Sequence, residues 1–372
     1  MREHSEFSVP QTLDGVRTLV EAGVWRGAAA LSERLLASTH PVDVLLTLRW
    51  YRIVALIKLH EVAKAEREMA MLGDLRSPSW QYERYPGVYP GLSGTMVPFA
   101  LLILHAMLPS YSGNHDHALA RLYALLSHET AAAAEASAEG TASQRIAERS
   151  QVMLAIVNVL CAVQEYPNAV AHLEQLIAAV QSAPSSAPQP GAGSDAGVTY
   201  DPAAGAGSGK LSQPELAPLL SLLGRVHLHL GNLEAAEDAF NRLECRVLGA
   251  DDSAQVRLNR GLLAMGSSQY SAALAEFEAA LAIDPASTIA ANNAAVCQLY
   301  CCRLSDAVGT MEKQLKRDPQ TSMHPVLVSN LANLYQMISS PGGVSNKHAL
   351  ERLVHAVASD DFDTSVLSLG QQ

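Results

Sequence analysis

A fixed interval of 34 residues recurs in the second half of the chain. Pro285 returns as Pro319, and Ala273 returns as Ala307. A constant period between 20 and 50 residues is typical of stacked supersecondary units, each of which cannot bury its apolar face alone. The chain is therefore expected to build a continuous array of neighbouring units, in place of one closed globular core.

A period of 34 residues is that of the tetratricopeptide repeat, a helix-turn-helix unit. In the clearest unit Gly261 and Ala273 allow two helices to approach closely, Phe277 fills the space between units, and Pro285 ends the second helix. The same 34-residue period predicts seven units along the chain: about 9–42, 46–79, 99–132, 150–183, 217–250, 254–287 and 288–321.

We therefore predict an all-α fold: a right-handed α-solenoid of about seven tetratricopeptide-type repeats, closed by a C-terminal capping helix pair at 324–337 and 347–357. No stretch alternates with a period of two over more than a few residues, so we expect essentially no sheet. Residues 130–143 either extend a helix or form a loop. The predicted organisation is divergent repeats at 1–132 with an aromatic loop at 78–94, a repeat with an Ala/Glu-rich lead-in at 133–183, a disordered Ser/Ala/Pro/Gly-rich insertion at 184–214, well-defined repeats at 215–321, and capping helices with a tail at 322–372.

Charge and composition exclude several classes of partner. The chain carries 26 Lys and Arg against 37 Asp and Glu, a net charge of −11, whereas a nucleic-acid binder needs a basic surplus to displace counterions. No apolar run approaches the ~20 residues that cross a bilayer, and no secretory signal pattern opens the sequence. Five cysteines without a regular spacing fit a reducing compartment. These features predict a cytoplasmic protein without membrane insertion and without nucleic acid.

The sequence offers no organised catalytic, cofactor or metal site. The Gly-rich stretch at 205–210 departs from a phosphate-binding loop, because Leu211 replaces the required Ser or Thr and no strand precedes it. Cys297, Cys301 and Cys302 lie on one predicted helix without a second pair of ligands, so core packing is their expected role. We predict that the chain is not an enzyme and binds no cofactor or metal.

Two features are candidates for partner binding. The first is a set of amides on the first helices of late repeats, Asn259, Asn292 and Asn293. Such amides can pair with an extended partner backbone, or they can cap helices and bond between repeats. The same helices do not favour a clamp for the acidic C-terminal tail of a partner, which requires Lys and Arg in successive repeats. Arg257 and Arg260 lie in one repeat, but the next repeat has Ile289 and Asn293.

The second candidate is the aromatic loop at 78–94. It contains Trp80, Tyr82, Tyr85 and Tyr89, separated by two Pro-Gly pairs that favour tight turns. Tyrosine and tryptophan supply wide contact area at low conformational cost, which suits a partner interface. The same rings can equally pack back over the neighbouring helices, and the sequence leaves both interpretations open.

Around this loop the chain resembles a known family. Residues 82–91, 94–99 and 104–106, together with Trp50 ahead of them and the run 291–297, are similar to the family of subunit twelve of the TRAPP vesicle-tethering complex. The resemblance extends from about residue 14 to 357 and is interrupted by 182–214. A generic repeat protein would share the repeat phase but not the aromatic loop.

The resemblance implies a function. A member of this family would be a non-catalytic scaffold in TRAPP III, joining core subunits to the large arm subunits of an assembly that promotes nucleotide exchange on a Rab-family GTPase. It would act in endoplasmic reticulum-to-Golgi transport and autophagy, peripherally associated with the intermediate compartment and the Golgi. The alternative is a stand-alone tetratricopeptide adaptor that binds peptides, as a chaperone co-factor or a cargo receptor.

Overall fold

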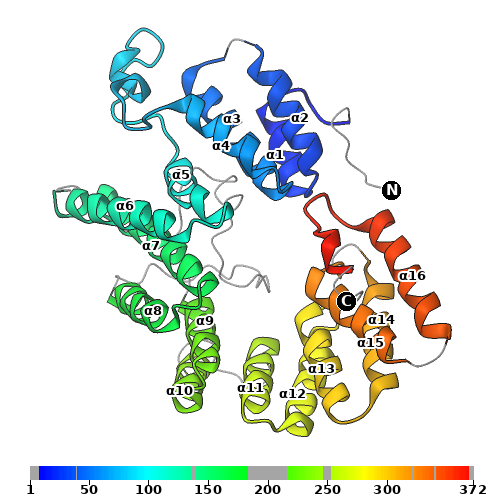
Figure 1. The fold of residues 1–372 in the computed structure, drawn as a ribbon. Helices are drawn as coiled ribbons and strands as arrows, with labels where there is room; N and C mark the ends of the chain where they lie inside the picture. The colour runs from blue at the N-terminus through cyan, green and yellow to red at the C-terminus, as the bar shows by residue number, and fades with distance from the viewer. Residues whose placement is uncertain are drawn as a thin grey trace. The chain divides into compact units, whose positions relative to one another are not determined.

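A computed structural model describes residues 8–38, 40–135, 139–182, 216–245, 253–319, 322–338 and 341–367. Over these ranges the chain forms sixteen α-helices and a few 3-10 turns, with no β-strand (Figure 1). Two residues, Gln81 and Thr95, form a single antiparallel bridge. The all-α prediction is confirmed.

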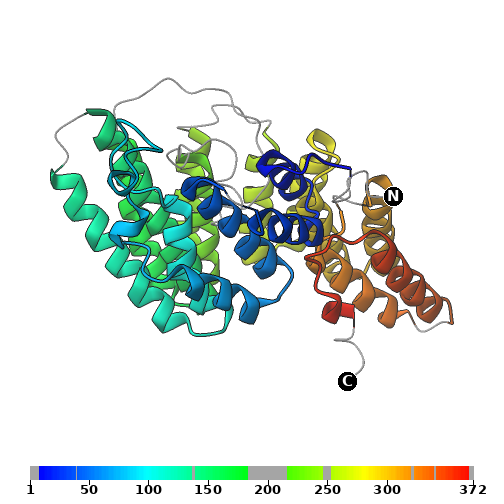
Figure 2. The ribbon, with the colours of Figure 1, turned by 90° about the horizontal axis from the view of Figure 1, so that it is seen from above.

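The chain divides into two compact units, Met1–Leu176 with Val198–Pro214, and Ile177–Gly197 with Glu215–Gln372. Helix α8 spans the division. Unit 1 contains α1 (Leu13–Glu21), α2 (Trp25–Leu36), α3 (Val42–Lys58), α4 (Val62–Leu72), α5 (Phe99–Tyr111), α6 (His115–Glu135), α7 (Glu139–Ala162) and most of α8 (Tyr166–Ser182). Figure 2 shows α5, α6 and α7 lying alongside one another within this unit.

Unit 2 continues the same pattern of consecutive helices that pack on each other. Its helices are α9 (Leu216–His229), α10 (Leu233–Leu243), α11 (Ala254–Gly266), α12 (Tyr270–Ile283), α13 (Thr288–Tyr300), α14 (Leu304–Arg317), α15 (Pro325–Met337) and α16 (Pro341–Val357). A 3-10 turn, η5 (Thr364–Leu367), packs on α15.

The helix pairs follow the predicted repeats. Seven pairs, from α1–α2 to α13–α14, match the seven units, and α15–α16 forms the closing pair. Helix α7 begins within the stretch 130–143, for which the sequence allowed either a helix extension or a loop, and α16 begins earlier than the predicted 347. Helix α7 begins at Glu139 because its Ala, Glu and Gln residues favour helix, and α16 begins at Pro341, a residue suited to the first helical position. The insertion predicted at 184–214 lies outside the described residues.

All seven pairs use the same turn. The second residue after the first helix has a positive φ, and the next backbone N–H donates to the carbonyl five residues earlier, at 2.8–2.9 Å. This is the Schellman termination of a helix, which favours glycine because other residues have a Cβ that disfavours positive φ. The seven residues are Gly23, His60, Gly113, Gln164, Gly231, Ser268 and Cys302.

Close helix crossings follow from two Gly–Phe pairs. A Cβ added to Gly261 would lie 2.5 Å from the ring of Phe277, and one added to Gly224 would lie 2.2 Å from the ring of Phe240. Phe277 is fully buried. The roles predicted for Gly261 and Phe277 are therefore confirmed.

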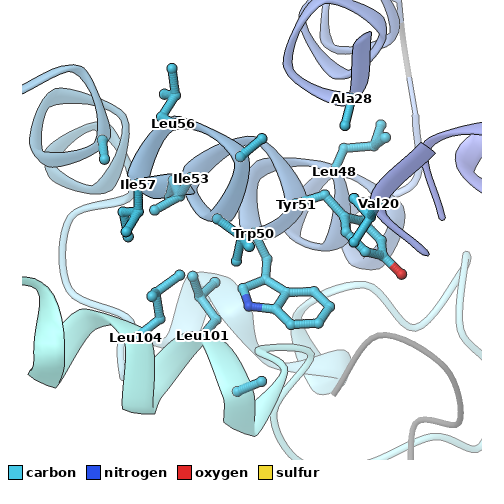
Figure 3. Packing of buried hydrophobic residues seen from close by; sticks show 14 of the residues in the cluster. Val20, Ala28, Leu48, Trp50, Tyr51, Ile53, Leu56, Ile57, Leu101 and Leu104 are labelled. Atoms are coloured by element: carbon cyan, nitrogen blue, oxygen red, sulfur yellow. The ribbon is translucent and has the colours of Figure 1, made fainter. Parts of the chain in front are cut away.

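Helix α3 forms the centre of the unit 1 core. It is apolar on several faces, and nine of its residues are buried. Figure 3 shows Trp50 pointing from α3 toward Leu101 and Leu104 of α5, while Tyr51 points toward Val20 of α1. Because α5 packs under α3, the connection from α4 to α5 must be long, and this connection carries the aromatic loop.

Candidate functional site

The aromatic loop (residues 78–94) is a folded connection between α4 and α5. It begins with two 3-10 turns, η1 (Pro78–Trp80) and η2 (Tyr82–Arg84). Its two ends are tied together by backbone hydrogen bonds: the Tyr82 N–H donates to the Gly94 carbonyl at 2.9 Å, and the Met96 N–H donates to the Trp80 carbonyl at 2.8 Å. The Gly94 N–H also donates to Glu83 Oε1 at 2.7 Å. These bonds give the loop a defined shape.

The four aromatic side chains of the loop are half-buried. Trp80, Tyr82, Tyr85 and Tyr89 pack against the core of unit 1. The rings of Tyr82 and Tyr89 meet edge to face, with 5.2 Å between their centroids. Each ring therefore buries part of its surface against the helices, which holds the loop in place, and the rest of the ring remains accessible.

Tyr89 ties the loop to α3 through its hydroxyl group. Its Oη donates to Asp43 Oδ1 at 2.5 Å, and the Asp43 N–H donates to Tyr89 Oη at 3.4 Å. Burial, followed by the hydrogen bond to the Asp43 carboxylate, raises the pKa of Tyr89. The neutral hydroxyl is the form that donates, so this contact persists at physiological pH.

The loop presents aliphatic side chains outward. Val88 is 63% exposed and Leu92 is 54% exposed, and each neighbours one of the Pro-Gly turns. Neither residue belongs to the set predicted from the sequence, which for this loop contained only aromatic side chains. The available signal was an aliphatic residue next to a tight turn, which seldom reaches the core when larger rings compete for it.

Asn259 lies inside unit 2. It is 1% exposed, and its Oδ1 accepts hydrogen bonds from Ser221 Oγ at 3.2 Å and from Gln255 Nε2 at 3.0 Å. Its Nδ2 has no partner within the described residues and lines a cavity of about 150 Å³ bordered by α10 and α11. The amide thus connects neighbouring repeats through its oxygen and leaves its donor unused.

Asn292 and Asn293 are half-buried on α13. Asn292 Oδ1 accepts from Asn330 Nδ2 of α15 at 2.9 Å, and Asn292 Nδ2 is 3.4 Å from Asn293 Oδ1. Asn292 bonds to the neighbouring repeat, as one interpretation of the sequence expected. Both amides also remain partly accessible, so pairing with a partner backbone stays a prediction. The sixth residue of α9, α11, α13 and α15 is polar throughout: Ser221, Asn259, Asn293 and Asn330.

In the part of the chain that the structure describes, no group of three or more His, Cys, Asp or Glu side chains is placed to hold a metal ion. Cys297 is buried in unit 2, and burial, with a smaller contribution from Cys301, raises the pKa of its thiol to about 11. A neutral buried thiol acts as a small apolar side chain. The Gly-rich stretch at 205–210 lies outside the described residues. Among the helices described, none is both long and apolar enough to cross a membrane.

Comparison with known proteins agrees with the repeat phase. The family model described as "Tetratricopeptide repeat" matches residues 262–327, which cover parts of α11 to α15. A solved tetratricopeptide repeat protein from Parabacteroides merdae is 13% identical, with a TM-score of 0.46, over 86% of this chain and 96% of that chain.

Two relatives extend over almost the whole sequence. Trafficking protein particle complex subunit 12 of Homo sapiens is 30% identical, and that of Mus musculus is 29% identical, each over 393 aligned residues and 97% of this chain. The alignments take in 49% of the human protein and 45% of the mouse protein. The chain spans about half the length of these relatives.

The helix pairs and their common turn define the class of fold, an all-helical array of repeated helix pairs, in which residues 262–327 match the tetratricopeptide repeat. The particular protein that the chain resembles, over 97% of its own length, is subunit 12 of the trafficking protein particle (TRAPP) complex. The resemblance drawn from the aromatic loop and the repeat phase is confirmed.

Proposed function

We propose that the chain is a non-catalytic scaffold subunit of the TRAPP III complex. In this role it links core subunits to the large arm subunits, and it serves endoplasmic reticulum-to-Golgi transport and autophagy from a position at the surface of those compartments. The observation that carries the proposal is the homology to subunit 12 over 97% of the chain. The Rab-family GTPase is an indirect partner, reached through the core subunits.

The physical form of the chain supports a scaffold. Stacked helix pairs expose long edges on which partners can bind at separate places. The aromatic loop is one proposed contact, with Trp80, Tyr82, Tyr85 and Tyr89 holding it in shape and exposing their edges. The other proposed contact is the face of unit 2 that carries Asn292 and Asn293, with Asn259 supporting it from inside.

Affinity capture of the tagged chain from its own cells, followed by mass spectrometry, tests the scaffold role. We expect core and arm subunits of TRAPP to be recovered together. Replacing Val88 and Leu92 by Ser removes exposed apolar surface from the loop without touching its packed rings, so it should reduce recovery of one group of subunits. Met71→Ser is the matched control, because Met71 is 61% exposed on α4, outside the loop.

The outcomes separate the two proposed functions. Recovery of chaperones or of one cargo without TRAPP subunits would replace the scaffold by the stand-alone adaptor. Recovery of TRAPP subunits at the same level by the loop variant and by Met71→Ser would keep the scaffold and remove the loop from its interface. Equal melting temperatures of the variants establish that both are folded.

The scaffold proposal also predicts an absence of activity. The purified chain should not accelerate nucleotide release from a Rab-family GTPase, because it contributes structure while other subunits perform the exchange. The release of a fluorescent guanine nucleotide, measured with the chain alone and with the whole complex, provides the comparison. Acceleration by the chain alone contradicts the proposal.

A further inference from the structure

A cleft of about 420 Å³ lies at the seam between the second and third helix pairs. Helices α4 and α5 contact each other less extensively than α2 and α3, the helices at the seam between the first two pairs. Met69 of α4 and Leu108 of α5 line the cleft, and both are buried apolar residues. We call this space the α4–α5 cleft.

One hydrogen bond crosses between the two sides of the cleft. Ser112 Oγ at the end of α5 donates to Glu66 Oε1 of α4 at 2.5 Å. Both residues are exposed, so the contact can be exchanged for water at little cost. The cleft can therefore admit a side chain from outside.

Arg121 is a positively charged residue of the cleft, which Glu66 also lines. Its Nε donates to His117 Nε2 at 3.2 Å, and its Nη1 donates to the His105 carbonyl at 3.1 Å. His117 accepts through its Nε2 and His105 through its backbone carbonyl, so neither contact brings a carboxylate to the guanidinium group. Burial, with the charge of Arg121 as the second cause, lowers the pKa of His105, so this imidazole is neutral at physiological pH.

Arg121 differs from other half-buried arginines. In the described ranges no carboxylate lies within ion-pair distance of its guanidinium group, although a half-buried arginine usually meets one. Five other half-buried arginines each contact a glutamate: Arg49 and Arg52 contact Glu68, Arg145 contacts Glu129, Arg257 contacts Glu276, and Arg260 contacts Glu244. Arg121 therefore differs from these five arginines, because within the described residues its contacts are to His117 and to the His105 carbonyl.

We propose that the α4–α5 cleft binds an acidic side chain of a partner protein, with an apolar neighbour of that side chain resting on Met69 and Leu108. Arginine has the planar set of donors that holds a carboxylate with two parallel hydrogen bonds. The chain has a net charge of −11, which disfavours the binding of an acidic segment at most places on its surface. The positive charge of Arg121 favours binding of such a segment at the cleft. This site does not depend on which complex the chain joins.

Peptide libraries test the site without a known partner. One library has the form acetyl-X-X-Glu-X-X-amide and a second has Gln at the central position, with X drawn from Leu, Val, Ser and Gly. We expect the purified full chain to enrich the Glu library over the Gln library at least threefold, as measured by affinity selection and mass spectrometry. Equal enrichment of the two libraries overturns the proposal.

Two variants of opposite effect connect the enrichment to the cleft. Arg121→Met should bring the Glu-to-Gln ratio to about one. Glu66→Gln removes the competing carboxylate and should raise the ratio at least twofold, an outcome that loss of folding cannot imitate. An unchanged ratio in both variants places the binding elsewhere and contradicts the proposal. Arg149→Met, on the exposed side of α7, is the control and should bind as the parent chain does.

A third library distinguishes the source of the carboxylate. It has the form acetyl-X-X-X-X with a free C-terminus and contains no acidic side chain. Enrichment of this library alone would make the site a receptor for chain ends and overturn the side-chain proposal. Because all three libraries are measured without TRAPP subunits, failure of this site and failure of the scaffold role are recorded separately.

Discussion

At the scale of single residues, the packing of unit 2 depends on two glycines. The absence of a Cβ at each glycine lets an aromatic ring of the paired helix lie against the backbone. Gly224 with Phe240 and Gly261 with Phe277 repeat this arrangement in two successive helix pairs. The first helix loses conformational stability by containing glycine, and the buried ring offsets that loss through its apolar area. A methyl group at either glycine would occupy the space of the ring, so overpacking decides the outcome.

Gly261→Ala should lower the free energy of unfolding by about 1–3 kcal/mol, the usual cost of overpacking a dense core. Gly309→Ala is the matched control, because Gly309 lies within α14 and an added Cβ there meets nothing within 4 Å. That variant should gain about 0.5–1 kcal/mol, since alanine favours helix more than glycine does. Chemical denaturation measures both, and equal signs would contradict this account of the crossing.

At the scale of the element, the aromatic loop is stabilised by contacts with distant parts of the chain. Tyr89 bonds Asp43 of α3, and the N–H of Tyr82 bonds the far end of the loop. Such a loop should open locally, with a lower free energy than the helices, because few elements hold it. Its order therefore depends on a small number of hydrogen bonds that can be tested singly.

Tyr89→Phe removes the hydroxyl that bonds Asp43 and leaves the ring in place. We expect the loop to open more readily by about 1.5–3 kcal/mol, the usual contribution of a hydrogen bond to a charged group. Faster hydrogen exchange at the amides of Tyr82 and Met96 would report this opening. Tyr300→Phe, which alters an exposed tyrosine outside the loop, should leave those amides unchanged. Unchanged exchange in the Tyr89 variant would show that the rings alone hold the loop.

The Glu83–Gly94 contact predicts a dependence on acid pH. The backbone N–H of Gly94, as the largest cause, lowers the pKa of Glu83 from the ordinary value of 4.5. A lowered folded-state pKa means that the contact stabilises the loop above pH 4.5 and that this contribution is lost as pH falls through the folded-state pKa. The amide resonance of Gly94 should therefore titrate below pH 4.5. Glu83→Gln should abolish that titration, and its persistence would assign the effect to another group.

At the scale of the whole molecule, one turn geometry and one helix-pair plan recur in both compact units. The chain between α8 and α9 carries residues 184–214, predicted from composition to be a disordered insertion. A flexible connection contributes to stability mainly through closure entropy, which changes by only about 0.6 kcal/mol for each doubling of its length. Its removal should consequently leave both units folded.

Deletion of residues 185–209 should change the melting temperature by no more than a few degrees. The reason is that the deleted segment is Ser-, Ala-, Pro- and Gly-rich and offers almost no large apolar side chain for packing. Differential scanning calorimetry of the parent and the deleted chain makes the comparison. A fall of ten degrees or more would show that the segment packs against the helices.

The sequence by itself determined the helix pairs, their period and the glycine and phenylalanine of the crossings, because these depend on residues close together in the chain. The starting points of helices were predicted less accurately, because α7 and α16 begin before the positions that the 34-residue period indicates. The relation to the TRAPP subunit could also be found in the sequence, through the loop and the repeat phase.

Only the tertiary structure decided which way the functional side chains face. Val88 lies outward while Tyr89 turns inward, because Asp43, which is 46 residues away, accepts the hydroxyl hydrogen of Tyr89. Asn259 and Asn292 belong to the same amide series, yet the first is enclosed and the second remains partly accessible. The α4–α5 cleft likewise brings residues of α4 together with residues of α5 and α6, which lie on the other side of the aromatic loop in the sequence. Contacts between residues far apart in the chain produce no periodic pattern in the sequence, so they could not be predicted from it. These contacts determine which surfaces a partner can reach.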